Sequence, residues 1–153
     1  MIPRVHKTEK EDRIMIHKNI FIQAEGSLKD SHLTTYILDS YEELEPNLKR
    51  PLVLICPGGA YRFTADREAE MIALHLNSVG YHAAVLRYSC APAIFPTALL
   101  EVAESIKLLK EKAEEWHIDT EKVFVMGFSA GGHLAASYGV FWNRPFVAEK
   151  TGV

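Results

Sequence analysis

A serine between small residues is the sharpest chemical feature of the sequence: Gly127-Phe128-Ser129-Ala130-Gly131. The apolar run Val123 to Met126 precedes it and small residues suited to a helix follow it, so we expect a strand-to-helix turn. Such a turn strains the serine backbone, and the residues two before and two after must be small to avoid collision. The exposed Ser129 oxygen, at a helix N-terminus that favours negative charge, is therefore a predicted nucleophile. The alternative is an idle serine in a glycine-rich turn.

A second glycine-rich segment, Pro57-Gly58-Gly59-Ala60-Tyr61, follows the apolar run Leu52 to Cys56. An acyl-transfer site must hold a negatively charged oxygen with backbone N–H groups, and small residues let the backbone approach the substrate carbonyl. Ala130, directly after the nucleophile, is one predicted donor, and Gly59 and Ala60 are the predicted donors from this loop. Taken alone, paired glycines more often mark a plain turn. A phosphate cradle is less favoured, because neither a G-x-G-x-x-G fingerprint nor a Walker lysine is present.

The elements that must position these residues follow an alternating pattern. Three apolar runs without polar alternation are typical of strands covered on both faces in a parallel sheet, and helical periodicity follows each of them. This alternation predicts an α/β layered fold, with two short β-rich segments before it that predict an antiparallel start. The expected strands are 20–23, 33–38, 52–56, 83–86 and 123–126, the expected helices are 66–79, 99–113 and 131–141, and a polar loop covers 41–50.

The sequence also indicates where the first helix begins and ends and which face of the second helix is buried. Asp66 is the expected N-cap of the first helix, and Gly80 lies just past its end. The second helix has an apolar stripe from Leu99 to Ala113, and its charged residues, Glu101 among them, are expected to form a solvated face. Both tryptophans, Trp116 and Trp142, are expected to pack in the core or at helix ends.

Composition is that of an ordinary globular domain, with 153 residues, 48% hydrophobic and 24% charged side chains and a net charge of −3. We expect one domain over residues 1–153. A general nucleic-acid binder is not indicated, because no dense basic block is present. Residues 1–19 lack the apolar region of a signal peptide, and no run of about 18 apolar residues exists to span a bilayer. The expectation is a cytoplasmic protein without membrane contact.

The cysteines and histidines indicate neither a disulfide scaffold nor a metal site. Two cysteines, Cys56 and Cys90, cannot build a disulfide scaffold, so free buried thiols are expected. The histidines His75, His82 and His117 lack the grouped spacing of a metal site. The sequence therefore indicates neither a metal nor another cofactor.

In its ordered motifs the chain resembles the N-terminal part of an α/β-hydrolase of the bacterial esterase/lipase type, close to the acetyl-esterase and feruloyl-esterase-like group. The resemblance implies a three-layer sandwich with a mostly parallel sheet and antiparallel N-terminal strands. It also implies a serine carboxyl-ester hydrolase that acts through an acyl-enzyme on short acyl esters, including acetylated carbohydrates. Many lipase relatives have a histidine before the glycines, where this chain has Cys56-Pro57. The match spans roughly residues 51–139 and includes 57–61, Leu86-Arg87-Tyr88, Pro96, Ile118-Asp119 and 127–135.

The resemblance places the triad acid and histidine downstream of the serine, and here the chain departs from the pattern. The twenty-four residues after Ser129 contain no Asp, one Glu (Glu149) and one His (His133). His133 lies one helical turn from the serine, where packing or a hydrogen bond within the helix is expected rather than a role as base. We therefore expect the C-terminal strands of the domain to be missing. The remaining histidines all precede the serine: His6, His17, His32, His75, His82 and His117.

Two alternatives to an ester hydrolase stay open. An arylformamidase-type amide hydrolase also combines a Gly-Gly loop with a Ser-Ala-Gly turn. The other alternative is a truncated, non-catalytic fragment: without its usual flanking strands, the strand 123–126 becomes an open edge that invites pairing. Such a chain is expected to dimerise, to associate with a complementary fragment, or to be marginally stable.

Overall fold

The computed structural model describes residues 14–40, 45 and 47–152. Residues 1–13, which include His6, and half of the polar loop (41–44 and 46) lie outside the described residues, so the predictions made for them stay predictions. The described part contains one five-stranded sheet in the order β1-β2-β4-β3-β5. Its strands are β1 (Asn19–Phe21), β2 (His32–Tyr36), β3 (Arg50–Cys56), β4 (His82–Arg87) and β5 (Ile118–Gly127).

The sheet is parallel where the sequence predicts a parallel sheet. Strand β3 pairs in parallel with β4 on one side and with β5 on the other, while β1 and β2 join the sheet antiparallel, as expected. The last residue of β3, Cys56, is paired with the last residue of β5, Gly127. Because both strands end side by side, the glycine-rich loop after β3 and the serine turn after β5 emerge at the same edge.

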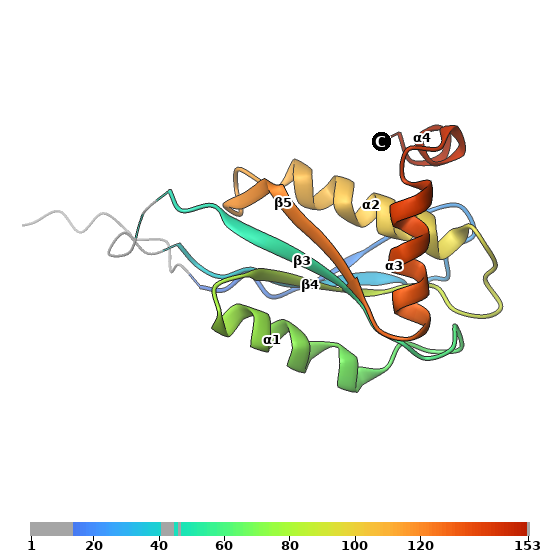
Figure 1. Cartoon of the computed structure of the whole chain (residues 1–153), viewed down its shortest axis with the longest axis horizontal. Helices are drawn as coiled ribbons and strands as arrows, with labels where there is room; N and C mark the ends of the chain where they lie inside the picture. The colour runs from blue at the N-terminus through green and yellow to red at the C-terminus, as the bar shows by residue number, and fades with distance from the viewer. Residues whose placement is uncertain (1–13, 41–44, 46, 153) are drawn as a thin grey trace, which may run out of the picture.

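Helices cover both faces of this sheet (Figure 1), which confirms the expected layers. On one face Ala73 of α1 and the preceding Ala69 pack against the side chains of β3 and β4. On the other face α2 and the start of α3 pack over the larger core, and α4 lies against α2. The helices are η1 (a 3₁₀ turn, Asp66–Glu68), α1 (Glu70–Ser78), α2 (Thr97–Glu111), α3 (Ala130–Phe141) and α4 (Pro145–Thr151).

The first helix does not begin as predicted. Residue Asp66 starts the 3₁₀ turn η1, Ala69 interrupts the helix with φ −119° and ψ −101°, and α1 follows without a side-chain cap. The carboxylate of Asp66 accepts a hydrogen bond from Arg87 at the end of β4 instead. The N-cap prediction is therefore wrong, because a guanidinium 21 residues away takes the capping oxygen. The end signal is confirmed, since Gly80 follows the helix with φ 92°.

The charged face of α2 is not wholly solvated. The Glu101 side chain is fully buried, and its carboxylate accepts hydrogen bonds from the Ser89 amide (2.7 Å), the Ser89 hydroxyl (2.5 Å) and the Ser27 hydroxyl (2.6 Å). These three donors come from the β1–β2 and β4–α2 connections, which cover the first turns of α2. The prediction for Glu101 is wrong because the donors compensate the loss of water around its charge.

Three further predictions concern burial. Strand β5 was expected to be buried, yet it is an edge strand of the described sheet and Phe124 is 51% exposed. Of the tryptophans, Trp116 lies in the core as predicted, while Trp142 lies at the end of α3 with 58% of its surface exposed. Both cysteines are free and buried, as predicted.

Among the helices of the described residues, none is long and apolar enough to cross a membrane.

Candidate active site

Ser129 lies in a strained turn between β5 and α3. Its backbone has φ 51° and ψ −120°, a conformation that costs a non-glycine residue on the order of 1–3 kcal/mol and persists only when the surroundings enforce it. Three backbone bonds enforce it here: Phe128 N donates to Cys56 O (3.1 Å), Gly131 N to Phe128 O (2.8 Å) and His133 N to Ser129 O (3.0 Å). The serine side chain is thus presented at the carboxyl edge of the sheet.

The requirement for small residues on either side of the serine is confirmed. A Cβ added at Gly127 would lie 2.0 Å from the Gly131 carbonyl oxygen. A Cβ added at Gly131 would lie 1.9 Å from the Cys56 carbonyl oxygen, which belongs to the neighbouring strand β3. Because both obstacles are backbone atoms, no side-chain movement relieves either collision.

The loop after β3 lies directly against this turn. A Cβ added at Gly58 would lie 3.1 Å from Ser129 Cβ, so the loop and the serine are in contact. Three consecutive loop residues have positive φ: Gly59 (136°), Ala60 (55°) and Tyr61 (56°). The backbone N–H groups of Gly59, Ala60 and Ala130 donate to no other described residue. The three predicted oxyanion donors thus belong to two adjacent loops and keep their amides unpaired among the described residues.

Side chains and amides from other segments fix this loop. The Tyr88 hydroxyl, which follows β4, donates to Pro57 O at 2.5 Å, and burial raises the pKa of this phenol, so it remains a donor. Ala91 N donates to Tyr61 O at 2.7 Å. Tyr88 belongs to the Leu86-Arg87-Tyr88 motif of the resemblance, which alone gave it no role.

His133 reaches the loop rather than its own helix. Its Nδ1 lies 2.8 Å from Tyr61 Oη, and the two rings pack edge to face with centroids 5.8 Å apart. Of the two expectations for His133, packing is confirmed by its ring contact with Tyr61, whereas its hydrogen bond goes to the loop and not to its own helix. A tyrosine two residues past the glycine pair was the available signal for this contact.

A cavity of about 230 Å³ adjoins Tyr61 and His133. The β4–α2 connection supplies Ile94 and Phe95 to its wall, and α3 supplies Leu134. A second, more polar cavity of about 610 Å³ is lined by Arg62, Thr64 and Arg87 among others. The sequence did not reveal either cavity, since the wall of each comes from three segments that are far apart in the chain.

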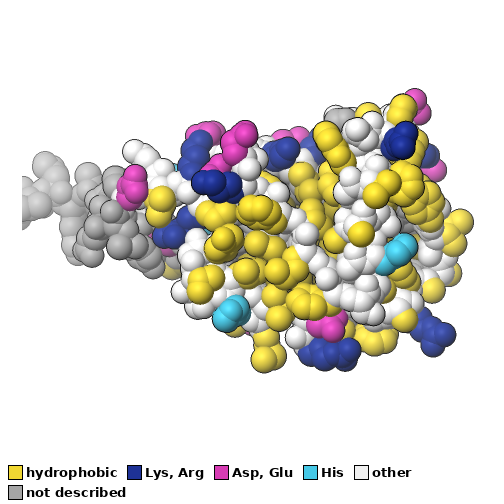
Figure 2. All heavy atoms as spheres, in the orientation of Figure 1, with side chains coloured by type: hydrophobic (Ala, Val, Ile, Leu, Met, Phe, Trp, Pro, Cys, Tyr) yellow, Lys and Arg dark blue, Asp and Glu magenta, His cyan; other side chains and the backbone are white. Residues whose placement is uncertain are grey.

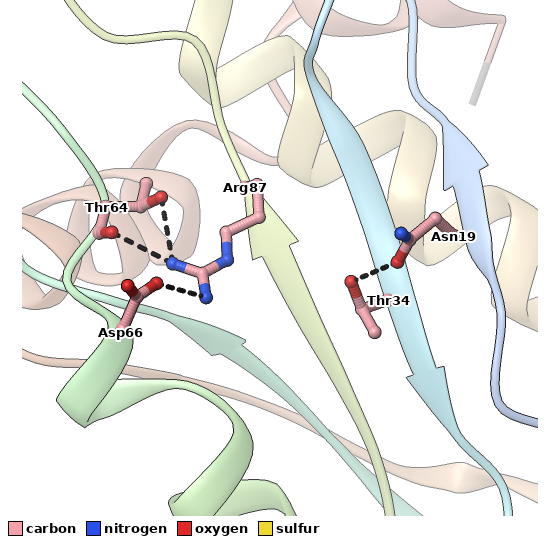
Figure 3. A network of polar contacts seen from close by, with 5 residues as sticks. All are labelled: Asn19, Thr34, Thr64, Asp66 and Arg87. Atoms are coloured by element: carbon pink, nitrogen blue, oxygen red, sulfur yellow. Dashed lines mark hydrogen bonds and ion pairs between the residues drawn. The ribbon is translucent and has the colours of Figure 1, made fainter.

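Arg87 lines the second cavity and binds the segment that follows the loop (Figure 3). From the end of β4, its Nη1 donates to the Thr64 carbonyl oxygen (2.9 Å) and hydroxyl (3.2 Å), and its Nη2 to Asp66 Oδ1 (2.9 Å). The guanidinium thereby holds the segment between the glycine-rich loop and η1. The same view places Asn19 and Thr34 on the antiparallel strands, where the Thr34 hydroxyl donates to Asn19 Oδ1 at 2.7 Å.

The cysteines beside the site are not competing nucleophiles. Burial raises the pKa of the Cys56 thiol to about 12, although the residue directly precedes the loop. Burial also raises the pKa of Cys90, and the carboxylate of Glu101 adds to that effect. A thiol needs its thiolate form to react, so neither cysteine is activated. In the described part of the chain, no group of three or more His, Cys, Asp or Glu side chains is placed to hold a metal ion.

Comparison with known proteins gives a consistent set of relatives. A family model, BD-FAE, matches residues 38–151. An acetylxylan esterase from Xylanibacter ruminicola is 30% identical over 81 residues, which cover 52% of this chain and 17% of that protein. The structure of MGS-M1, an α/β-hydrolase from a Medee basin deep-sea metagenome library, is 43% identical with a TM-score of 0.74, over 80% of this chain and 50% of that one.

A second solved structure extends the similarity to more of the chain. The carboxylesterase Cest-2923 from Lactobacillus plantarum is 27% identical with a TM-score of 0.76, over 88% of this chain and 50% of that one. The chain thus spans half the length of these solved structures and 17% to 25% of the length of the curated relatives it matches.

Proposed function

Because the chain belongs to the BD-FAE family of α/β-hydrolase-like domains, we propose that it carries the nucleophile and oxyanion amides of a serine carboxyl-ester hydrolase. Its mixed sheet with helices on both faces is part of the α/β-hydrolase fold. The proposal rests on one observation: the strained Ser129 turn lies in contact with the glycine-rich loop. A serine with φ 51° is a costly arrangement, and such strain is typical of functional sites.

In the proposed first step, the Ser129 oxygen bonds to the ester carbonyl carbon, and the carbonyl oxygen takes up negative charge. The amides of Gly59, Ala60 and Ala130 donate hydrogen bonds to that oxygen. The C–O bond to the alcohol then breaks, the alcohol leaves with a proton, and the acyl group remains on Ser129 until water releases it. Removal of a single oxyanion donor typically lowers kcat by about 10²–10³-fold, so these amides are a large part of the proposed catalysis.

A base must accept the Ser129 proton, and His133 does not suit this role. Its Nδ1 is hydrogen bonded to Tyr61, and it lies one helical turn beyond the serine. We therefore expect the 153-residue chain alone to react slowly. Loss of a triad base lowers kcat by factors of about 10³ or more, and the oxyanion amides sustain the residual rate. A diffusible base such as imidazole is expected to restore part of the lost rate.

Acetyl esters of carbohydrates are the proposed substrates. Their support is the name of the acetylxylan esterase relative and the size of the cavity beside His133. At about 230 Å³ this cavity is smaller than the roughly 300–1,000 Å³ of sites for drug-sized ligands. A short acyl group fits such a space better than a long alkyl chain does.

The test is covalent labelling of the purified chain with a fluorophosphonate. Attack forms the Ser129 O–P bond, breaks the P–F bond and transfers the serine proton to added imidazole. We expect one adduct per chain by intact mass, placed on Ser129 by peptide mapping, and a labelling rate that rises with imidazole concentration. The release of p-nitrophenolate from p-nitrophenyl acetate is expected to follow the same dependence.

The matched control is Ser129→Ala. This variant is expected to take up no label and to retain the circular dichroism spectrum of the parent chain. Equal labelling of the variant, or an adduct on another residue, would remove Ser129 as the nucleophile. Faster turnover of N-formylkynurenine than of p-nitrophenyl acetate would point to amide rather than ester hydrolysis.

A further inference from the structure

The glycine-rich loop is held in a conformation that the backbone does not favour by itself. Ala60 and Tyr61 both have φ near 55°, in the left-handed region that non-glycine residues seldom adopt, and they follow Gly59 directly. Two such residues cost on the order of 1–3 kcal/mol each, so external contacts must stabilise the loop. Those contacts decide which amides face Ser129.

Most of the contacts bind carbonyl groups of the loop. Pro57 O accepts from the Tyr88 hydroxyl, Gly58 O accepts from Ala65 N at 2.8 Å, and Tyr61 O accepts from Ala91 N. These bonds fix the carbonyl groups of the loop but do not bind its N–H groups. One loop amide is bound differently: Gly58 N donates to Glu68 Oε2 at 2.8 Å.

The Glu68 carboxylate is placed next to the serine. A Cβ added at Gly58 would lie 2.8 Å from Glu68 Oε2 and 3.1 Å from Ser129 Cβ, so the carboxylate and the serine both lie next to the same glycine. The Glu68 side chain is 19% exposed, and its other oxygen lies 3.6 Å from Arg67 Nε, which offsets part of its charge. Its element, η1, begins at the segment that Arg87 holds against the end of β4 (Figure 3).

We infer that Glu68 is a positioning residue of the oxyanion loop. Its carboxylate binds the Gly58 amide and removes that N–H from the set facing the site, which leaves Gly59 and Ala60 as the donors. Glu68 does not touch the substrate; it acts through the orientation of the Pro57–Gly58 peptide. This inference rests on the proposed function, because it assigns a task to a loop whose amides are proposed to stabilise the oxyanion.

Two variants distinguish the effect of the Glu68 hydrogen bond from the effect of its charge. Glu68→Gln retains an acceptor oxygen for Gly58 N, whereas Glu68→Ala removes the acceptor. We expect Glu68→Ala to lower the imidazole-supported kcat for p-nitrophenyl acetate about 10- to 100-fold with little change in KM, because misplaced donors weaken only transition-state binding. Glu68→Gln is expected to stay within about threefold of the parent chain. Glu70→Ala, the loss of an exposed carboxylate two residues further on, is the matched control and is expected to leave kcat unchanged.

Hydrogen exchange of the Gly58 amide provides a readout independent of activity. We expect this amide to exchange at least tenfold faster in Glu68→Ala than in the parent, and to stay protected in Glu68→Gln and Glu70→Ala. Unchanged exchange and unchanged kcat in Glu68→Ala would overturn the inference, as would a Glu68→Gln variant as impaired as Glu68→Ala. If the parent chain is not acylated at all, the proposed function fails, while the exchange of Gly58 still decides the role of Glu68. Should Glu68→Ala not fold, Glu68→Met, which keeps a side chain of similar length without an acceptor oxygen, replaces it in both readouts.

Discussion

His82 is a histidine that the fold keeps uncharged. It lies fully buried at the start of β4, where its Nδ1 accepts a hydrogen bond from Leu38 N (3.1 Å) and its Nε2 donates to His117 O (3.2 Å). One ring nitrogen must accept while the other donates, so the surroundings select a single neutral tautomer. Burial lowers the pKa of His82 to about 4, against an ordinary value of 6.5.

The lowered pKa of His82 predicts a pH dependence of stability. Between pH 6.5 and about 4 the unfolded chain binds a proton at this residue and the folded chain does not. The contribution is therefore complete above pH 6.5 and is lost progressively as the pH falls toward 4, by roughly 3 kcal/mol in free energy of unfolding. Urea unfolding of the parent chain and of His82→Gln, at several pH values, measures it. The glutamine keeps an acceptor and a donor, so this part of the slope is expected to disappear; equal slopes would contradict the assignment.

Sequence reasoning succeeded at residues whose backbone conformation is enforced by their immediate neighbours. The Ser129 turn follows from its own neighbours, because Gly127 and Gly131 must be small whatever surrounds them. It failed at Glu101 and missed the hydrogen-bond partner of His133, because the partners of these residues lie up to 74 residues away in the chain. No periodicity reports such partners, since a charged residue on a helix has the same sequence pattern whether water or buried serines surround it.

At the scale of elements, helix α3 is tightly packed at its start and has open space around Gly139 near its end. Gly131 packs against the carbonyl oxygens of Cys56 and Pro57, whereas a Cβ at Gly139 would meet no atom within 4 Å. One helix therefore contains a glycine that leaves no room for a side chain and a glycine that does. The close contact at Gly131 is what brings the N-terminus of α3 onto the end of β3.

This contrast predicts opposite effects of the same substitution. Gly131→Ala is expected to destabilise the fold by about 3 kcal/mol or more, because the added methyl collides with fixed backbone. Gly139→Ala is expected to stabilise by up to about 1 kcal/mol through helix propensity alone. Thermal and denaturant unfolding of both variants measure these changes. A Gly131→Ala chain as stable as the parent would mean that the turn tolerates more than the structure allows.

The elements themselves were predicted better than their ends. All five expected strands and all three expected long helices are present, because apolar periodicity reflects burial over many residues. The break at Ala69 was missed, since it arises where Arg87 holds Thr64 and Asp66 from another strand. The short helix α4 was also missed, although Pro145 at its first position was a usable start signal.

At the scale of the whole molecule, the described sheet ends at the parallel strand β5. Strand β3 is flanked by β4 and β5, but β5 has no described strand on its outer side. Figure 2 shows hydrophobic side chains gathered over the region of β5. Exposed apolar side chains nearby include Phe124 on β5 and Val140 and Trp142 at the end of α3. The burial expected from the sequence requires a neighbour on this side, which the described chain does not supply.

An open edge of this kind predicts self-association of the 153-residue chain. Strand β5 is ten residues long, its apolar half 123–126 carries no charged side chain, and unpaired strand edges of this type pair with other chains. Sedimentation or light scattering is expected to give a mass that rises with concentration above the 17.2 kDa of one chain. Phe124→Lys is expected to reduce this association, because a charge on the exposed strand opposes pairing, while Val79→Lys, at an exposed position on the end of α1, is expected to leave it unchanged. A parent chain that remains monomeric at every concentration and melts at high temperature would refute the open edge as an association site.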